Sequence, residues 1–539
     1  MRRVALSLAM LALGAGVIGH AAAQRAAGKG IREGGTFRIA QPGVDFVDPA
    51  LSYRPWGWAL IDTTCARLMT YPDKPPPEGL RLVPEIAVGY PRVSHDRKTW
   101  TFKLRSGFRF SDGTPVRASA FAHAIYRTLA PGMNSPGAQY TQAIVGAEDV
   151  LAGRRQTVTG VVARGNTLVV RFTRPVPDFA AQTTMPFFCA VPPALPADPE
   201  GVRAFPGAGP YYVAEYRPDQ SVVILPNRFY RGTRPHHVHR FVVDQTAPNT
   251  NEVLDRIERG DADWGRVPPF AYFDPARRLA AKYGVNRSQF FVKPSLVSHA
   301  FAFNVSRPLF RNNARLRRAV NFAVDRRALR QASGPSLLST LTDQNLPRAL
   351  PAFHDAQIYP LNGPGLQRAR SLARGNTRGG KAVLYTFGFP VALAVAQVVK
   401  QNLARIGLDV EVKGLPPDGY IERLASPNEP WDIAFTPYGA DYVDPYTFLN
   451  LQFDGRFIGA NNLSRFDSPR YNRLLRQAAR LQGRARDRAY GRLDVQLARD
   501  AAPMIAFQNP NEPTLVSRRV DPRCIVVRPA LDLTAVCLK

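Results

Sequence analysis

Residues 383–412 read VLYTFGFPVALAVAQVVKQNLARIGLDVEV, and this stretch decides the fold class. Residues 383–386 form a short apolar run, and residues 408–412 alternate apolar and acidic side chains, so both predict strands. Between them, residues 393–406 have the apolar spacing of a helix that ends at Gly407. A strand, a helix and a strand in this order make a parallel βαβ unit, whose ligand crevice lies at the carboxyl ends of the strands. We therefore expect an α/β protein.

A second informative stretch follows at residues 431–449, where a predicted buried strand (431–435) opens into a loop with two carboxylates, Asp441 and Asp444. Aromatic side chains, including Tyr438 and Tyr442, are interleaved with these carboxylates. A carboxylate walled by aromatic rings suits an ammonium group, because charge pairing fixes the cation and the rings exclude water. The alternative is a packed loop in which an aspartate caps a helix or forms an internal ion pair.

The N-terminus predicts export. Arg2 and Arg3 precede an apolar run that ends near Ala21-Ala-Ala23, which is typical of a signal peptide (1–23) cleaved before Gln24. The pattern G-x-G-x-x-G at residues 14–19 lies in the apolar core of this signal and is not a nucleotide site. The rest of the chain has no apolar run of ~20 residues, so we expect a protein that does not span the membrane.

Composition narrows the class further. A length of 539 residues with 45% hydrophobic residues indicates two or more globular domains. The formal net charge of +29 comes from scattered, mostly single arginines rather than from a dense basic block, which argues against nucleic-acid binding. Attraction of the protein to anionic membrane surfaces or acidic partners fits this charge better. In an exported chain the four cysteines permit two disulfides. Cys524 and Cys537 flank a short C-terminal stretch and are the favoured pair, which leaves Cys65 and Cys189 able to form the other.

No catalytic, metal or cofactor site is predicted. His236, His237 and His239 cluster, but the sequence H-E-x-x-H is absent and Arg234 and Arg240 would repel a cation. Paired carboxylates such as Asp261 and Asp263, or Asp441 and Asp444, could in principle serve a glycosidase, but no accompanying motif supports a hydrolase.

Other parts of the chain alternate strands and helices. The patterns predict a strand at 35–40, a hairpin within 100–110, a helix over 118–129, a hairpin within 158–172, paired strands at 211–216 and 221–225, a helix over 250–259 and a helix over 316–329.

Several of these segments resemble one known family. The motifs are LVPEIA (82–87) with WTFKLRSGFRFSDGTP (100–115), GAGPYY (207–212), IERGDAD (257–263), FNV (303–305) with LRRAVNFAVDR (316–326), and GADYVDP (439–445). In order and separation they are similar to those of the extracellular solute-binding proteins of family 5, the peptide receptors of ATP-binding-cassette importers. The resemblance covers nearly all of residues 35–516.

The resemblance implies a two-lobed periplasmic-binding-protein clamp of type II, in the large oligopeptide-binding subclass, with an extra inserted subdomain. The expected division is lobe I at 24–52, an inserted subdomain at 53–202, lobe I again at 203–294, lobe II at 295–500 and a return to lobe I at 501–539. The clamp would be a periplasmic monomer that closes on its ligand and delivers it to an inner-membrane permease, and it would not be an enzyme.

The resemblance also implies a ligand. Asp441 stands where oligopeptide-binding members pair a carboxylate with the peptide's α-ammonium, so peptides are the expected ligands. The remaining candidate ligand-binding residues are aromatic: Tyr438, Tyr442, Trp431, Trp56 and Tyr53. The resemblance leaves other ligands open, because relatives of this architecture also take up oligosaccharides, opines and nickel chelates, and tryptophan rings can stack on sugars. A secreted hydrolase is a more distant alternative function.

Overall fold

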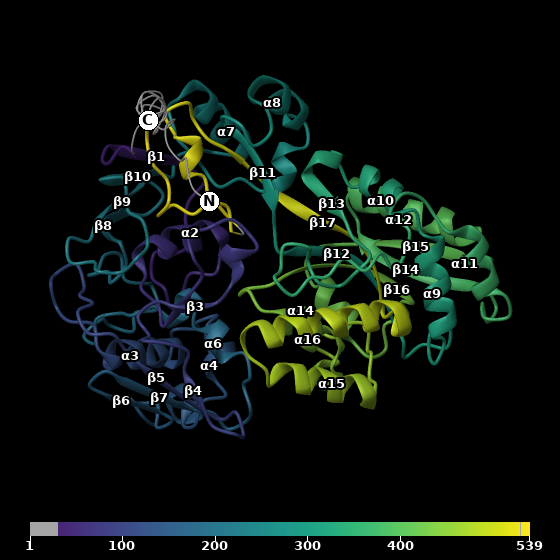
Figure 1. Cartoon of the computed structure of the whole chain (residues 1–539), viewed down its shortest axis with the longest axis horizontal. Helices are drawn as coiled ribbons and strands as arrows, with labels where there is room; N and C mark the ends of the chain where they lie inside the picture. Colours follow the sequence, from purple (N-terminus) through teal and green to yellow (C-terminus); the bar gives the residue numbers. More distant parts are fainter. Residues whose placement is uncertain (1–30, 529) are drawn as a thin grey trace, which may run out of the picture.

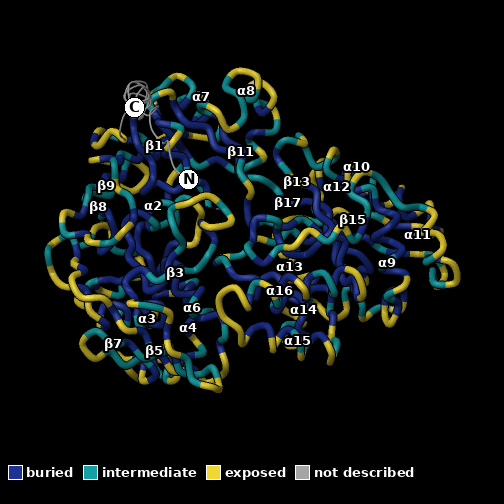
Figure 2. The backbone as a smooth tube through the Cα atoms, viewed as in Figure 1, coloured by how far each residue is buried: buried dark blue, intermediate teal, exposed yellow. Residues whose placement is uncertain are grey.

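The computed structural model describes residues 31–528 and 530–539, which form two lobes connected by strands near the centre of the molecule (Figure 1). The expected signal peptide, residues 1–23, lies outside the described residues. Buried backbone runs through the middle of each lobe, and exposed backbone lies at loops and outer helix faces (Figure 2). The predicted α/β two-lobed clamp is confirmed.

One sheet of the first lobe has the strand order β1-β10-β9-β8. β1 (Thr36–Ala40) runs parallel to β10 (Arg240–Asp244), and β9 (Ser221–Pro226) and β8 (Tyr211–Arg217) continue the sheet antiparallel. Alternate residues such as Phe37, Ile39 and Phe241 are buried, which gives the sheet one core face. α7 (Thr250–Arg259) lies beside it and ends at Gly260, whose φ of 87° favours glycine.

A second sheet in the same lobe belongs to the chain between residues 53 and 202. It has the order β4-β5-β7-β6, formed by Arg92–Val93, Thr99–Lys103, Thr167–Arg171 and Val161–Arg164. α3 (Ala118–Leu129) packs on it as the sequence predicts. The predicted hairpin within 100–110 is wrong, because β5 pairs with β4 and with the distant β7, where Trp100 and Phe102 reach the core.

The second lobe is built on the sheet β11-β17-β12-β16-β14-β15, with β13 (Ser339–Leu341) beside β17. β14 (Lys381–Phe387), α12 (Pro390–Ala404) and β15 (Asp409–Leu415) form the predicted parallel βαβ unit. Helices cover both faces of the sheet (Figure 1). On one face are α9 (Ala314–Ala323), α10 (Arg326–Ala332), α11 (Leu366–Ala373) and α12; on the other are α14 (Pro445–Phe453), α15 (Pro469–Ala479) and α16 (Gly483–Gln496).

Two predictions for this lobe are corrected. The single helix expected over 316–329 is two helices, because Asp325 leaves the helical conformation and caps α10 by accepting from the Ala328 N–H. The strand expected at 431–435 is β16 (Ile433–Gly439), which includes Pro437 because β12 (Val297–Phe303) pairs with it throughout. The carboxylate loop therefore begins only at Ala440.

Two strands join the lobes. β11 (Phe290–Pro294) leads into β12, and β17 (Met504–Leu515) pairs with β12 through its first half and with β11 through its second. At the junction, the Ser295 hydroxyl donates to the Pro510 carbonyl at 2.6 Å, and the Asn509 amide donates to the Val297 carbonyl at 3.1 Å. The crossing is thus made of paired strands, and these two side-chain hydrogen bonds keep them in register.

Both predicted disulfides are confirmed. Cys65 and Cys189 close a loop of 124 residues within the first lobe, and Cys524 and Cys537 fasten the C-terminal segment.

A buried ion pair ties the N-terminal part of the first lobe to α3. The Asp48 carboxylate receives Arg127 Nη1 at 2.8 Å and Nη2 at 2.6 Å, and both side chains are fully buried. Removing one partner of such a pair leaves an uncompensated buried charge, so Asp48→Ala should lower the free energy of unfolding by about 3–5 kcal/mol in urea denaturation. The matched control is Asp149→Ala, which removes an exposed pair with Arg154 and should cost below about 1 kcal/mol. Equal effects would contradict the assignment.

The hinge strand also predicts a pH dependence. His299 on β12 packs against Phe435 and Phe507, and its burial lowers the pKa to about 4 from the ordinary 6.5. The unfolded chain therefore binds this proton more readily, so the stability that His299 contributes is present above pH 6.5 and is lost as the pH falls towards 4. Thermal melts should show a smaller loss over this range for His299→Gln than for the parent, whereas His354→Gln, at an exposed position, should behave like the parent.

Candidate functional site: a carboxylate between the lobes

The loop after β16 places its two carboxylates in different surroundings. Asp444 caps α14 by accepting from the Tyr446 N–H at 2.8 Å, and it pairs with the buried Arg486 guanidinium at 2.7 Å. Asp441 is exposed, and no arginine, lysine or histidine nitrogen of the described residues lies within 4 Å of it. The capping and ion-pairing role therefore belongs to Asp444, and Asp441 keeps its charge available.

Asp441 is held by two hydroxyl groups from the other lobe. Its Oδ2 accepts from the Tyr53 hydroxyl at 3.0 Å and from the Tyr140 hydroxyl. Tyr53 precedes α2 (Pro55–Thr64), and Tyr140 lies in α4 (Ala138–Thr141). Among the described residues none donates to the second oxygen, Oδ1. One oxygen is thus oriented by the protein and the other is left for a donor from outside.

Electrostatics keep both phenols protonated. Burial raises the pKa of Tyr53, and the neighbouring Asp441 carboxylate raises it further. The same two causes, in the same order, raise the pKa of Tyr140. Neutral phenols therefore donate to Asp441 at physiological pH instead of competing with it for a cation.

Aromatic rings pack on the two tyrosines that hold this carboxylate. The Tyr53 ring lies 5.8 Å from Trp58 and 6.2 Å from Phe187, measured between centroids, and Tyr140 lies 5.9 Å from Phe187 and 6.2 Å from Tyr442. The arrangement combines one anionic oxygen with several π faces. Such a box is chemically suited to an ammonium group with an apolar or aromatic neighbour.

The six residues predicted from sequence do not all meet. Tyr53, Asp441 and Tyr442 come together, although the hydroxyl of the buried Tyr442 is used by Asp178 across the lobes. Trp56 donates to the Arg266 carbonyl at 3.1 Å, away from this carboxylate.

The remaining two lie within the second lobe. Trp431 is fully buried in the core, where its indole donates to the Leu424 carbonyl, so the prediction that it stacks on a ligand has no support from its position. Tyr438 packs on Phe448 and lines a cavity of about 690 Å³ next to the carboxylate loop. Glu422 is the only charged residue that lines this cavity.

Sequence reasoning missed Tyr140 and Phe187. Both lie in short helical turns of four and three residues, which carry no periodic pattern. Tyr140 meets Asp441 only because the two lobes come together, since these residues are 301 positions apart in the chain.

In the described part of the chain, a histidine of the cluster at 236–239 pairs with a carboxylate. His237 Nδ1 lies 2.8 Å from Glu33 Oε1. Within the described part of the chain, no group of three or more histidine, cysteine, aspartate or glutamate side chains is placed to hold a metal ion.

The two-lobed α/β clamp is the architecture of periplasmic solute-binding proteins. The sequence profile described as bacterial extracellular solute-binding proteins, family 5 Middle, matches residues 81–459. The chain belongs to this family. Across the described residues, none of the helices combines the length and apolarity that crossing a membrane requires.

Individual relatives agree with the family. The chain is 24% identical to the probable D,D-dipeptide-binding periplasmic protein DdpA of Escherichia coli, over 86% of each chain, and 26% identical to the periplasmic murein peptide-binding protein MppA of the same organism, over 79% of this chain and 80% of MppA. Among solved structures it is similar to the clavulanic acid biosynthesis oligopeptide binding protein 2, with a TM-score of 0.80, 28% identity, and coverage of 94% and 96% of the two chains.

The different roles of Asp441 and Asp444 can be tested by measuring the free energy of unfolding of variants at each position. Asp444→Asn should lower the free energy of unfolding by about 3 kcal/mol, because it leaves the buried Arg486 without its counter-ion. Asp441→Asn should change it by less than about 0.5 kcal/mol, because the amide oxygen still accepts a tyrosine hydroxyl and no cation loses a partner. Urea unfolding of both variants measures the difference. A large loss for Asp441→Asn would make Asp441 a structural residue.

Proposed function

We propose that the protein captures peptides and that Asp441 binds their α-ammonium group. The observation that carries this proposal is the unpaired Oδ1 of a carboxylate that two tyrosines orient inside an aromatic box. An ammonium offers three donors and a full charge, so it satisfies Oδ1 and is attracted to the rings. The peptide-binding relatives DdpA and MppA support the same ligand class.

Capture proceeds by closure of the clamp. Asp441 comes from the second lobe, whereas Tyr53 and Tyr140 come from the first. A ligand that occupies this contact interacts with both lobes at once, so it stabilises the closed arrangement relative to the open one. The paired strands at Ser295 and Pro510 form the axis about which the lobes move.

The cavity beside Tyr438 receives ligand side chains in this proposal. It is roomy and, apart from Glu422, lined by neutral residues. A pocket of this kind accepts side chains of different size with water filling the remaining space, which favours broad specificity over selection of one sequence.

The biological setting is part of the same proposal. The protein is exported to the periplasm after cleavage between Ala23 and Gln24, acts as a monomer and delivers its ligand unchanged to an inner-membrane permease of an ATP-binding-cassette importer. Its lobes divide at residues 24–52, 53–202, 203–294, 295–500 and 501–539. No catalytic role is assigned to any residue.

Binding of matched peptides tests the ammonium assignment. Asp441→Asn should weaken the binding of a free-amine tripeptide by about ten- to hundred-fold in isothermal titration calorimetry, because a charge-assisted contact is lost. It should leave the affinity for the N-acetylated tripeptide unchanged. Asp418→Asn, at an exposed position of the same lobe, is the matched control and should bind both peptides as the parent does. Equal binding of the free-amine peptide by Asp441→Asn and parent would overturn the assignment.

A further inference from the structure

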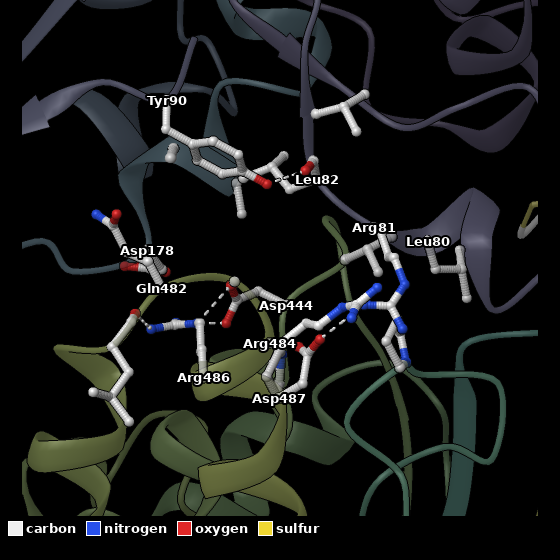
Figure 3. Close-up of a pocket in the computed structure, with 18 of the residues that line it drawn as sticks. Leu80, Arg81, Leu82, Tyr90, Asp178, Asp444, Gln482, Arg484, Arg486 and Asp487 are labelled. Atoms are coloured by element: carbon white, nitrogen blue, oxygen red, sulfur yellow. Dashed lines mark hydrogen bonds and ion pairs between the residues drawn. The ribbon is translucent and has the colours of Figure 1, made fainter.

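A second cavity borders the end of the carboxylate loop, at Val443 and Asp444. Its volume is about 290 Å³, and its lining includes Asp444 but neither Asp441 nor Tyr438. Figure 3 shows that its walls come from both lobes: Leu80, Leu82 and Tyr90 stand on one side, and Asp444, Arg486 and Asp487 stand on the other. The proposed peptide site does not use this cavity.

The interior of this cavity is largely apolar. Leu80, Leu82, Tyr90, Trp100 and Leu350 contribute its hydrophobic wall. Trp100 is 1% exposed, and its indole N–H has no hydrogen-bond partner in the described part of the chain. A buried donor without a partner costs free energy, so the packing around Trp100 is not fully satisfied within the protein.

Each carboxylate around the cavity already has a partner within the protein. Asp444 pairs with Arg486, Asp487 pairs with Arg81 at 3.5 Å, and Asp178 accepts from the Tyr442 hydroxyl. Burial also raises the pKa of Asp178 and of Asp487, which disfavours their charged forms further. Acidic side chains therefore leave little negative charge to repel an anion.

Positive charge extends from the cavity along α16. Arg484, Arg488 and Arg492 follow one another at intervals of four residues, so they share a helix face, and all three are exposed. Within the described residues none of them has a carboxylate partner within 4 Å. They line a groove of about 410 Å³ that shares Arg81, Arg484 and Asp487 with the apolar cavity.

The start of α16 adds to this potential. The helix begins at Gly483 with no side-chain cap from Gln482 and with no acidic residue in its first turn. Free N–H groups at a helix N-terminus attract anions, and here arginines occupy positions where acidic residues are favourable. The apolar cavity and the basic groove thus meet at one point.

We propose that this cavity and groove form a second ligand site, which takes a small amphipathic anion with an apolar body and a phosphate or carboxylate head. The apolar body lies against Leu82, Tyr90 and Leu350, and the head lies at the start of α16 between Arg484 and Arg488. Because the walls come from both lobes, an occupied site would tie them together and so couple this ligand to clamp closure.

The test uses octyl phosphate as the probe, titrated below its micellar concentration into the mature protein by calorimetry. Arg484→Gln/Arg488→Gln should weaken binding by about ten-fold, because two charge-assisted contacts at partly exposed positions are lost. The matched control is Arg473→Gln/Arg476→Gln, which removes the same charge from exposed positions of α15 and should bind within about two-fold of the parent.

Two further probes separate the parts of the ligand. Octanol carries the apolar body alone and inorganic phosphate carries the head alone, and both should bind at least about ten-fold more weakly than octyl phosphate. Equal losses in both double variants, or equal binding of either fragment, would overturn the proposal. The site shares no residue with Asp441 and its tyrosines, so these outcomes leave the peptide assignment to its own experiment.

Discussion

The pairing of β17 with both β11 and β12 is the constraint on which this architecture depends. This single strand of 12 residues pairs with β12 through its first half and with β11 through its second, so it holds together the two chain segments that cross between the lobes. Buried arginines hold this strand and the turn before it: Arg326 donates to the Ala506 carbonyl of β17 at 2.8 Å, and Arg317 donates to the Ala501 carbonyl just before β17 at 2.9 Å. Burial lowers the pKa of each to about 10, which still leaves both protonated at neutral pH. The first half of the strand is therefore anchored in the second lobe.

These arginines also change how the net charge of +29 is understood. Arg127, Arg317 and Arg326 are buried and satisfy a carboxylate or backbone carbonyls, so part of the positive charge holds elements together instead of forming a surface. A guanidinium is suited to this task because its five donors can satisfy several oxygens at once. A count of basic residues therefore overstates the positive surface available to polyanions. Arg484, Arg488 and Arg492 on α16, by contrast, are exposed and concentrate positive charge in one place.

The parts of the fold that the sequence predicted are those with a repeating local pattern. The helix at α3 and the unit β14-α12-β15 follow from apolar periodicity alone. The pairing of β5 with β7 was missed because Ser106-Gly107 looks like a hairpin turn, while the partner strand lies more than 60 residues further on. The break at Asp325 was missed because its side chain substitutes for a helical hydrogen bond, which apolar spacing cannot register.

In the site, too, the residues with a local sequence pattern were predicted and those that depend on long-range contacts were not. Asp441 was predictable because a strand end, a loop and aromatic residues lie together in the sequence. The different role of Asp444 follows only from the structure, where Asp444 pairs with Arg486. Two residues show what the sequence could not predict about the site. Tyr140, which was missed, reaches Asp441 from a four-residue turn, whereas Trp56, which was predicted, donates to the Arg266 carbonyl instead. Contacts between lobes depend on where two independent cores dock. One short segment borders both cavities: Gly439 lines the cavity beside Tyr438, and Val443 and Asp444 line the cavity between the lobes, so a ligand held in either cavity contacts residues 439–444.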